Sequence, residues 1–175
     1  VRGQYGPGYI NGKEVKGYRQ EDNVAPASQV ETYAALKLSI DNWRWNGVPF
    51  YLRAGKRLAK KSTEIAIVFK KTPGYLFQTD TKRNEPNVLV IRIQPDEGIS
   101  LKMNCKIPGL NNLIQPVNMN FQYGSYFGAA PPEAYERLIC DCMAGDKTLF
   151  ARADEVLASW SLLTPVLEYW AATKQ

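Results

Sequence analysis

The sequence predicts an α+β domain, with a large, mostly antiparallel β-sheet followed by C-terminal helices that pack on one of its faces. Between residues 31 and 123, short runs of apolar residues alternate with polar ones and are separated by Pro, Gly and Asn, which is typical of strands. No segment between these runs is long enough for a helical crossover, so the strands are expected to be antiparallel. From residue 131 onward the apolar spacing becomes helical.

The N-terminal residues 1–29 are rich in Gly, Pro, Asn and charged residues, and they predict an irregular arm with room for one short hairpin. Residues 32–40 then alternate between apolar and polar side chains, which favours a strand buried on one face. Residues 41–47 end that strand. The same alternation predicts five further strands, at residues 49–53, 64–70, 87–94, 98–106 and 117–123.

The C-terminal residues 131–175 predict two amphipathic helices. Pro131 and Pro132 suit the start of the first helix, and Gly145 suits its end. Its apolar residues recur at i, i+3, i+4 and i+7, and they are Tyr135, Leu138, Ile139 and Cys142.

The second helix is expected to begin near Asp154 and Glu155, because acidic side chains are favourable in a first helical turn. Pro165 is expected to kink or break it near Leu162. If the helices cover one face of the sheet, the other face must meet water, another domain or a second copy of the chain.

The composition is that of a single soluble, globular domain. With 175 residues, of which 45% are hydrophobic, the chain is long enough to bury most of its apolar surface in one core. Its net charge of +5 suits an anionic ligand but is weaker than that of a dedicated nucleic-acid-binding protein. No apolar run approaches the roughly 20 residues of a membrane span, and no signal-peptide pattern opens the chain. We therefore expect a cytoplasmic protein that binds neither membrane nor nucleic acid.

The cysteines Cys105, Cys140 and Cys142 have no CxxC spacing, and the chain contains no histidine. Neither a zinc site nor a disulfide framework is therefore expected, and the thiols are predicted to be reduced and mostly buried. No other metal site is indicated. The sequence opens on Val1, and its first residues look like the middle of a polypeptide, so we expect a part of a longer protein.

The most informative segment follows the strand predicted at residues 49–53. Gly55 is expected to let the chain bend, and four cations then follow within six residues, namely Lys56, Arg57, Lys60 and Lys61. The turn can bring Lys56 and Lys61 to one side, where two ammonium groups suit a dianion such as a phosphate. A solvated basic loop beside an edge strand fits the same residues, so the spacing leaves both interpretations open.

The remaining motifs say less about function. The glycines between residues 3 and 8 lack the G-x-G-x-x-G order of a nucleotide-binding loop, and Pro7 removes a backbone donor. Asp96 and Glu97 are predicted to form a solvated turn. Trp43 and Trp45 fit either a base-stacking platform or anchors that hold a turn against the core, and the second interpretation is favoured. Without a histidine, no general base can be named in this chain.

Five blocks, in this order, resemble the C-terminal half of the glucose-6-phosphate dehydrogenase family over essentially the whole chain. They are Arg-Gly-Gln-Tyr at 2–5 with Lys-Gly-Tyr at 16–18, Trp-Asn-Gly-Val-Pro-Phe at 45–50, Leu-Arg-Ala-Gly-Lys at 52–56, Val-Ile-Arg-Ile-Gln-Pro at 90–95, and Ala-Tyr-Glu-Arg-Leu-Ile at 134–139. The resemblance implies that residues 1–175 form a C-terminal substrate-binding and oligomerisation domain, with an arm at 1–29, a sheet at 31–123 and helices at 131–175.

The activity that the resemblance implies is oxidation of glucose 6-phosphate to 6-phosphogluconolactone with NADP, at the entry to the pentose phosphate pathway. In that family an N-terminal Rossmann-type domain binds most of the coenzyme and supplies the histidine base, so this chain is expected to contain no catalytic residue and to be inactive alone. Lys56 and Lys61 match the family's substrate contacts, with Gln94 as a weaker third. The open sheet face is expected to form a homodimer or homotetramer.

Some members of the family hold a second, structural NADP against the sheet. Arg53, Arg92 and Lys102 match three of its contacts and are weak candidates for cofactor binding. Ser62, Ala66 and Ser100 stand where basic or aromatic residues are expected, and the chain ends at Gln175, before the tail that closes that site. The resemblance therefore weighs against a structural NADP here.

Two other classes of function fit the sequence less closely. One is a basic nucleic-acid-binding α+β module that uses the cations of residues 53–61 and the neighbouring aromatic side chains. The other is a purely structural dimerisation domain.

Overall fold

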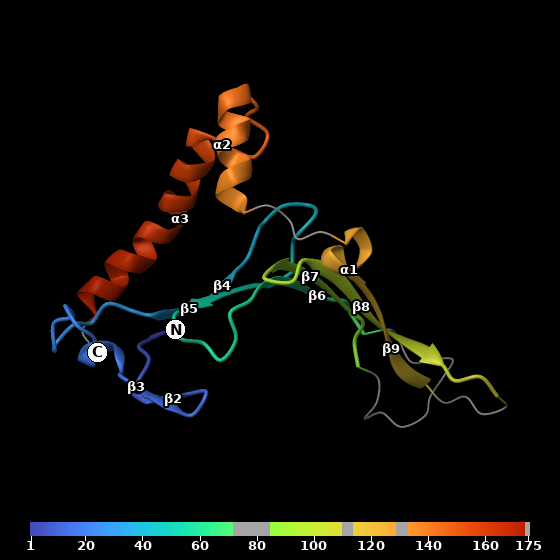
Figure 1. Ribbon diagram of the computed structural model, residues 1–175, viewed down its shortest axis with the longest axis horizontal. Helices are drawn as coiled ribbons and strands as arrows, with labels where there is room; N and C mark the ends of the chain where they lie inside the picture. The colour runs from blue at the N-terminus through green and yellow to red at the C-terminus, as the bar shows by residue number, and fades with distance from the viewer. Residues whose placement is uncertain (72–84, 110–113, 129–132, 174–175) are drawn as a thin grey trace. The chain divides into compact units, whose positions relative to one another are not determined.

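The computed structural model describes residues 1–71, 85–109, 114–128 and 133–173 and divides the chain into two compact units, Val1–Asn120 and Phe121–Gln175. The first unit contains the strands except for the last two residues of the final strand, and the second contains the α-helices (Figure 1). The predicted α+β class is confirmed. The assignment of residues 1–175 as a substrate-binding and oligomerisation domain stays a prediction, as does the packing of the helices on a sheet face.

The N-terminal arm forms the hairpin that its composition left room for. Strands β2 (Gly8–Ile10) and β3 (Lys13–Val15) pair antiparallel around Asn11 and Gly12, whose φ angles are 50° and 77°. Two consecutive left-handed residues are the signature of a tight hairpin turn, and Asn-Gly is the pair that tolerates them best. The arm also contains strand β1 (Arg2–Gly3) and a short 3₁₀ helix, η1 (Tyr18–Gln20).

Strand β1 joins β4 (Tyr33–Leu38) and β5 (Phe50–Gly55) in a three-stranded antiparallel sheet, in the order β1-β4-β5. The turn between β4 and β5 is held by the Asn42 side chain, which accepts hydrogen bonds from the backbone N–H groups of Arg44 at 3.1 Å and Trp45 at 2.8 Å. From the sequence, both Trp43 and Trp45 are expected to anchor this turn.

Trp45 does so in part, because its ring meets that of Phe50 edge-on at 5.3 Å between centroids. For Trp43 the expectation is wrong, since its side chain is fully exposed. The Asn42 side chain already satisfies the donors of the turn, so the turn has no need of a second aromatic anchor.

The remaining strands, β6 (Thr63–Val68), β7 (Val88–Gln94), β8 (Gly98–Lys106) and β9 (Ile114–Gln122), form a four-stranded sheet in chain order. The pairs β6–β7 and β7–β8 are antiparallel. Each predicted strand is observed within three residues of its predicted ends. Tyr123, predicted as the end of the last strand, instead begins a short helix, α1 (Tyr123–Phe127).

The register of this sheet gives its two faces different chemistry. Ile65 lies opposite Ile91, and Ile91 lies opposite Ile99, so one face carries a ladder of isoleucines. On the other face, Arg92 lies between Glu64 and Gly98. Because side chains alternate between faces along a strand, the isoleucines and the oppositely charged pair of Glu64 and Arg92 lie on opposite sides of the sheet.

The second unit contains helix α2 (Ala134–Ala144), which ends as the sequence predicted. Gly145 adopts a left-handed φ of 74°, and its N–H donates to the carbonyls of Asp141 and Cys142. A glycine in this conformation closes a helix without a Cβ clash. Pro131 and Pro132, predicted to start the helix, lie outside the described residues.

Helix α3 (Ala153–Ala172) begins where the acidic residues predicted it to. The carboxylate of Glu155 accepts a 3.0 Å hydrogen bond from the backbone N–H of Arg152 and so satisfies a donor at the helix start. A break near Leu162 does not occur, because the helix runs uninterrupted past Pro165. Proline deprives one carbonyl of its donor, but the hydrogen bonds on either side persist in a helix of 20 residues.

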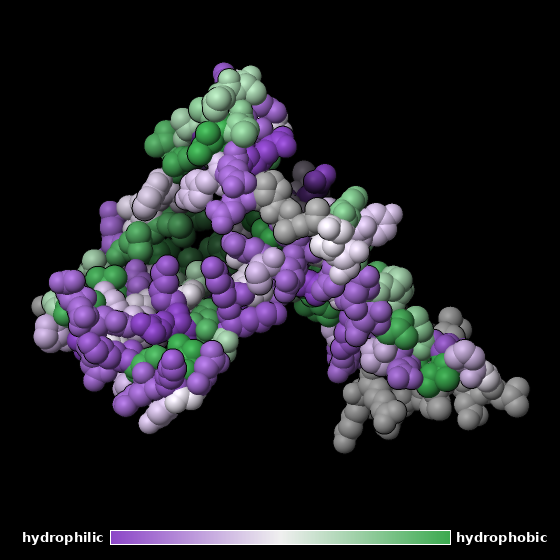
Figure 2. Space-filling view, in the orientation of Figure 1, coloured by the Kyte–Doolittle hydropathy of each residue, from purple (hydrophilic) through white to green (hydrophobic). Residues whose placement is uncertain are grey.

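The expected hydrophobic core is not found among the described residues, none of whose hydrophobic side chains is fully buried. Ile65 is 51% and Ile139 is 59% exposed, and Figure 2 shows hydrophobic residues at the surface of both units. The prediction of mostly buried thiols is likewise wrong for Cys140 and Cys142, which are exposed on α2. Strand pairing satisfies the backbone without covering the faces of a sheet, so these apolar surfaces need cover that the described contacts do not provide.

No helix in the described part of the chain combines the length and hydropathy that crossing a membrane requires.

Candidate functional site

The predicted substrate residue Lys56 lies immediately after strand β5. The last pair of the β4–β5 ladder joins Tyr33 to Gly55, and the backbone N–H of Lys56 then donates a 2.8 Å hydrogen bond to the carbonyl of Thr32. The Lys56 backbone therefore continues the sheet by one further hydrogen bond, while its side chain leaves from the sheet's end.

The bend after Lys56 has a different origin from the one predicted. Gly55 was expected to let the chain bend, but it is the last residue of β5, and the left-handed residue of the turn is Arg57, with a φ of 54°. Gly55 is needed for space, since a Cβ at this position would lie 2.8 Å from Cδ2 of Tyr33 and 3.3 Å from Cδ2 of Leu58. This steric need was not predicted, because the sequence does not show that the side chain of Tyr33 lies across the glycine.

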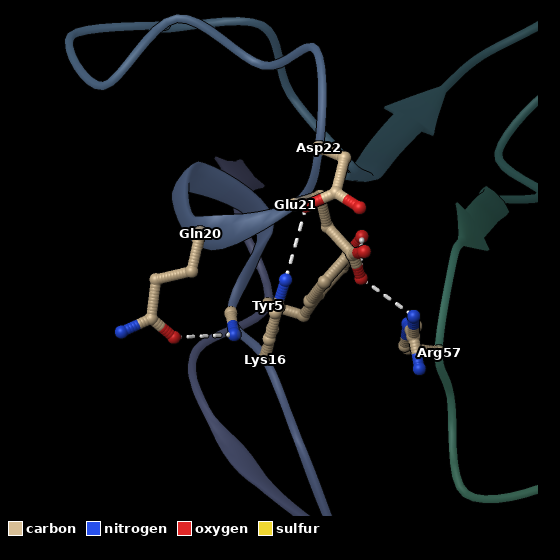
Figure 3. Close-up of polar contacts among 7 residues, drawn as sticks. Tyr5, Lys16, Gln20, Glu21, Asp22 and Arg57 are labelled. Carbon is tan, nitrogen blue, oxygen red and sulfur yellow. Dashed lines mark hydrogen bonds and ion pairs between the residues drawn. The ribbon is translucent and has the colours of Figure 1, made fainter.

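Arg57 is held by two residues of the N-terminal arm, as Figure 3 shows for the ion pair. Its Nη2 lies 2.5 Å from Oε1 of Glu21, and its Cζ lies 5.4 Å from the ring centre of Tyr5. The hydroxyl of Tyr5 donates to the same Glu21 oxygen at 3.3 Å. Hydrogen bonding with Tyr5 and the nearby charge of Glu21 raise the pKa of Arg57 above its ordinary value.

Thr32 links the arm to the same turn. Its N–H donates to the carbonyl of Gly3 at 2.9 Å, and its Oγ1 accepts a 3.0 Å hydrogen bond from the N–H of Tyr5. Its carbonyl in turn accepts the N–H of Lys56. Tyr5 therefore reaches the turn along two routes, through Thr32 to the backbone of Lys56 and directly to Arg57.

The arm segment that carries Glu21 has further polar contacts, which are drawn in Figure 3. Lys16 and Asp22 form an ion pair at 3.0 Å, and the side chain of Gln20 accepts a 2.9 Å hydrogen bond from the N–H of Gly17. Gly17 has no room for a side chain, because a Cβ there would lie 2.8 Å from the nitrogen of Pro7. These contacts fix the short stretch of chain from which Glu21 projects.

Lys61 and Gln94 lie at the same end of the strand pair formed by β6 and β7. Lys61 lies at the far end of the β5–β6 loop and two residues before β6, whose first residue, Thr63, is opposite Gln94. The amide of Gln94 is 3.5 Å from the hydroxyl of Thr63. One loop therefore connects Lys56 to Lys61, and strand pairing brings Gln94 next to the end of that loop. Their roles as substrate contacts stay predictions.

The three candidates for a structural NADP are divided between two sheets. Arg53 lies on β5, in a different sheet from Arg92 and Lys102. Lys102 is paired with the carboxylate of Glu85, and hydrogen bonding with Lys102 lowers the pKa of Glu85. Arg92 alone fits an anion, because its Nε and Nη2 are buried without a hydrogen-bond partner.

A carboxylate beside Lys102 repels a phosphate, and Ser62, Ala66 and Ser100 supply no positive charge to offset that repulsion. The described residues therefore do not fit a structural NADP. Within the same part of the chain, no three His, Cys, Asp or Glu side chains gather as metal ligands would.

Sequence reasoning missed the contribution of the arm. Glu21 and Arg57 are 36 residues apart, and nothing in the local pattern of either marks them as partners. The one sequence signal for the arm was that Tyr5 and residues 16–18 belong to the motifs that carry the family resemblance. No contact between these residues and the Lys56 turn was inferred from them.

Comparison with known proteins identifies the family of the chain. The family described as glucose-6-phosphate dehydrogenase, C-terminal domain, matches residues 1–175. The chain is 62% identical over 173 residues to glucose-6-phosphate 1-dehydrogenase of Chlamydia pneumoniae, covering 97% of the chain and 34% of that protein. It is 50% identical over 174 residues to the enzyme of Bacillus subtilis, covering 99% of the chain and 36% of that protein.

Solved structures agree. A glucose-6-phosphate dehydrogenase in complex with its substrate glucose 6-phosphate is 40% identical, with a TM-score of 0.82 over 97% of this chain and 34% of that one. The enzyme from Mycobacterium avium is 38% identical, with a TM-score of 0.77 over 96% of this chain and 33% of that one. The chain thus spans about a third of the length of these relatives. It belongs to the glucose-6-phosphate dehydrogenase C-terminal domain family.

Proposed function

We propose that this chain is the substrate-binding and subunit-contact part of an NADP-dependent glucose-6-phosphate dehydrogenase. The observation that carries the proposal is the match of all 175 residues to the C-terminal domain of that family. A relative of the same fold and 40% identity is known in complex with glucose 6-phosphate, which supports the sugar phosphate as the substrate. The comparisons give no support to a nucleic-acid-binding module or to a purely structural dimerisation domain.

In this proposal Lys56 and Lys61 bind the sugar phosphate from the two ends of the β5–β6 loop. Each ammonium group offers three donors and a positive charge, which suit a phosphate dianion or a sugar hydroxyl. Gln94, beside Thr63 at the start of β6, orients a hydroxyl with its amide. The chain holds and positions the substrate, and the anchored backbone of Lys56 makes that position reproducible.

The reaction removes a proton from the C1 hydroxyl and a hydride from C1, which leaves the lactone. NADP, when bound, accepts the hydride. This chain contains no histidine, so a histidine base has to come from another part of the enzyme. We therefore expect the isolated chain to be inactive and the coenzyme to bind mainly outside it. A cytoplasmic location and a homodimer or homotetramer formed through the sheet belong to the same proposal.

The test is steady-state kinetics of the full-length dehydrogenase that contains this chain, with Lys56→Ala and Lys61→Ala compared with the wild type. Loss of a charged hydrogen bond costs about 1.5–3 kcal/mol, so we expect the KM for glucose 6-phosphate to rise roughly 10- to 150-fold while that for NADP changes little. Lys13→Ala, which removes an exposed lysine from the β2–β3 hairpin, is the matched control. Equal changes in both KM values would overturn the sugar-phosphate role.

A further inference from the structure

We propose that Arg57, held by Glu21 and Tyr5, positions the side chain of Lys56 for the sugar phosphate without touching the phosphate itself. The inference rests on the proposed function of Lys56 and goes beyond it, because neither the sequence pattern nor the comparisons assign a role to the arm. Tyr5, Glu21 and Arg57 are called the arm clamp below.

The first support for this role is that Lys56 is fixed on both sides. On the N-terminal side, the backbone N–H of Lys56 donates to the carbonyl of Thr32, and the hydroxyl oxygen of Thr32 accepts a hydrogen bond from the N–H of Tyr5. On the C-terminal side, the next residue is Arg57, whose guanidinium lies over the ring of Tyr5 and pairs with Glu21. Two anchors one residue apart, both connected to Tyr5, leave the backbone of Lys56 little freedom to rotate.

The second support is the backbone conformation of Arg57. A non-glycine residue with a φ of 54° is in the left-handed region, which side chains with a Cβ adopt only when surrounding contacts hold them there. The contacts that do so are the ion pair with Glu21 and the stacking on Tyr5. If these two contacts are removed, the backbone of Arg57 is expected to relax to a negative φ. The direction in which the side chain of Lys56 leaves the sheet then changes as well.

The third support is that the guanidinium of Arg57 already has an anionic partner in the carboxylate of Glu21. Its Nη2 is 2.5 Å from a carboxylate oxygen that also accepts the hydroxyl of Tyr5. A phosphate brought to the same guanidinium meets the negative charge of Glu21, which disfavours direct binding. The two possible roles of Arg57 therefore predict opposite effects of removing that charge.

If Arg57 positions Lys56, then Glu21→Gln weakens the clamp and raises the KM for glucose 6-phosphate. If Arg57 instead binds the phosphate, Glu21→Gln frees the guanidinium and lowers that KM. A purely structural clamp changes the melting temperature and affects glucose 6-phosphate and NADP alike.

The experiment measures kcat, both KM values and the melting temperature of the full-length dehydrogenase carrying Arg57→Asn, Glu21→Gln or both. Asn removes the guanidinium and tolerates a left-handed backbone well enough for the turn to fold, but without the contacts to Glu21 and Tyr5 nothing holds residue 57 in that conformation. We expect Arg57→Asn, which removes both the ion pair and the cation–π contact, to raise the KM for glucose 6-phosphate by about 3- to 10-fold. Glu21→Gln removes only the charge of the ion pair and is expected to raise the same KM by a smaller factor. The double variant is expected to match Arg57→Asn, because the charge of Glu21 acts in the clamp through the guanidinium. The KM for NADP and the melting temperature stay close to those of the wild type.

Arg152→Asn is the matched control, since it removes an exposed arginine paired at 2.9 Å with Asp154 in the second unit, and we expect no change in either KM. Arg57→Lys keeps the charge and is expected to recover part of the loss. If Arg57→Asn does not fold, Tyr5→Phe removes only the hydroxyl that reaches Glu21 and is expected to give a smaller rise in the same KM.

A lower KM in Glu21→Gln would overturn the proposal, as would unchanged kinetics in Arg57→Asn while Lys56→Ala still raises the KM. In the second case the proposed substrate role of Lys56 stands and only the clamp fails. If Lys56→Ala has no effect of its own, the proposed function fails first.

Discussion

The backbone N–H of Lys56 donates a 2.8 Å hydrogen bond to the carbonyl of Thr32. This bond extends the β4–β5 ladder beyond its last strand pair and ties the predicted substrate lysine to a residue that also contacts the N-terminal arm. A lysine side chain is long and flexible, so the precision of its ammonium group depends on a fixed starting point. The structure provides that point through Thr32 and Arg57.

Gly55→Ala is expected to disturb this turn. The new Cβ would lie 2.8 Å from Cδ2 of Tyr33 and 3.3 Å from Cδ2 of Leu58, so the strand end has to shift. Overpacking of this kind typically costs about 1–3 kcal/mol of stability. We expect a lower melting temperature together with a higher KM for glucose 6-phosphate, because Lys56 moves with the strand.

Gly3→Ala is the control for this variant. Gly3 pairs with Tyr33 from the other side, and a Cβ there meets nothing within 4 Å. The control should therefore leave both quantities nearly unchanged. If Gly55→Ala behaves like Gly3→Ala, the steric account of Gly55 is wrong.

The isoleucine ladder of the four-stranded sheet is expected to contribute to subunit association. Ile65 is 51% exposed, and burying the remaining apolar area in a symmetric interface contributes about 1 kcal/mol from each subunit. Ile65→Lys removes this contribution and places a charge there, so we expect the dimer of the full-length protein to dissociate at least about 30-fold more readily. Sedimentation over a range of concentrations measures the effect.

Glu64→Lys places the same charge on the opposite face of the same strand and serves as the comparison. A larger loss of association in Glu64→Lys than in Ile65→Lys would show that subunits meet on the charged face instead.

Asp146, in the loop between α2 and α3, predicts a pH dependence. Hydrogen bonds from the hydroxyl of Thr148 at 2.6 Å and from its backbone N–H at 2.9 Å lower the pKa of Asp146. A carboxyl group with a lowered pKa in the folded state stabilises the protein above its unfolded pKa, and this stabilisation is lost as the pH falls through the folded value.

Thr148→Val keeps the backbone bond and removes the hydroxyl, so it should lower the melting temperature at pH 7. The difference from wild type should begin to shrink as the pH falls below about 4, the ordinary pKa of an aspartate, and should vanish once the pH is below the lowered pKa of folded Asp146. Thr148→Ser retains the hydroxyl and should behave as the wild type does. A difference that is the same at both pH values would mean that the hydroxyl acts by some means other than the charge of Asp146.

Much of the local structure followed from the sequence. The alternation of apolar and polar residues predicted the six strands from β4 to β9, because each strand divides its side chains between two faces. Gly145 marked the end of α2 because a left-handed residue is required there. The short strand β1 was missed, since two residues carry no alternation, and α1 was missed because its five residues lie directly after a strand.

The candidate site was predicted less completely. Lys56, Lys61 and Gln94 were identified from their resemblance to a family, and the structure shows that one loop and one strand pair connect them. The chain was expected to bend after Gly55, but the left-handed conformation at Arg57 was not predicted, because it depends on tertiary contacts that hold an arginine in that conformation.

The sequence by itself determined the α+β class, the family and the absence of a histidine base from this chain. These properties depend on residue types and their local spacing, which are fully visible in a sequence. Only the tertiary structure showed that the N-terminal arm holds the Lys56 turn. The ion pair between Glu21 and Arg57 spans 36 residues, and its formation depends on where β1 and η1 bring the arm. Such contacts are fixed by the path of the whole chain, and no local pattern encodes them.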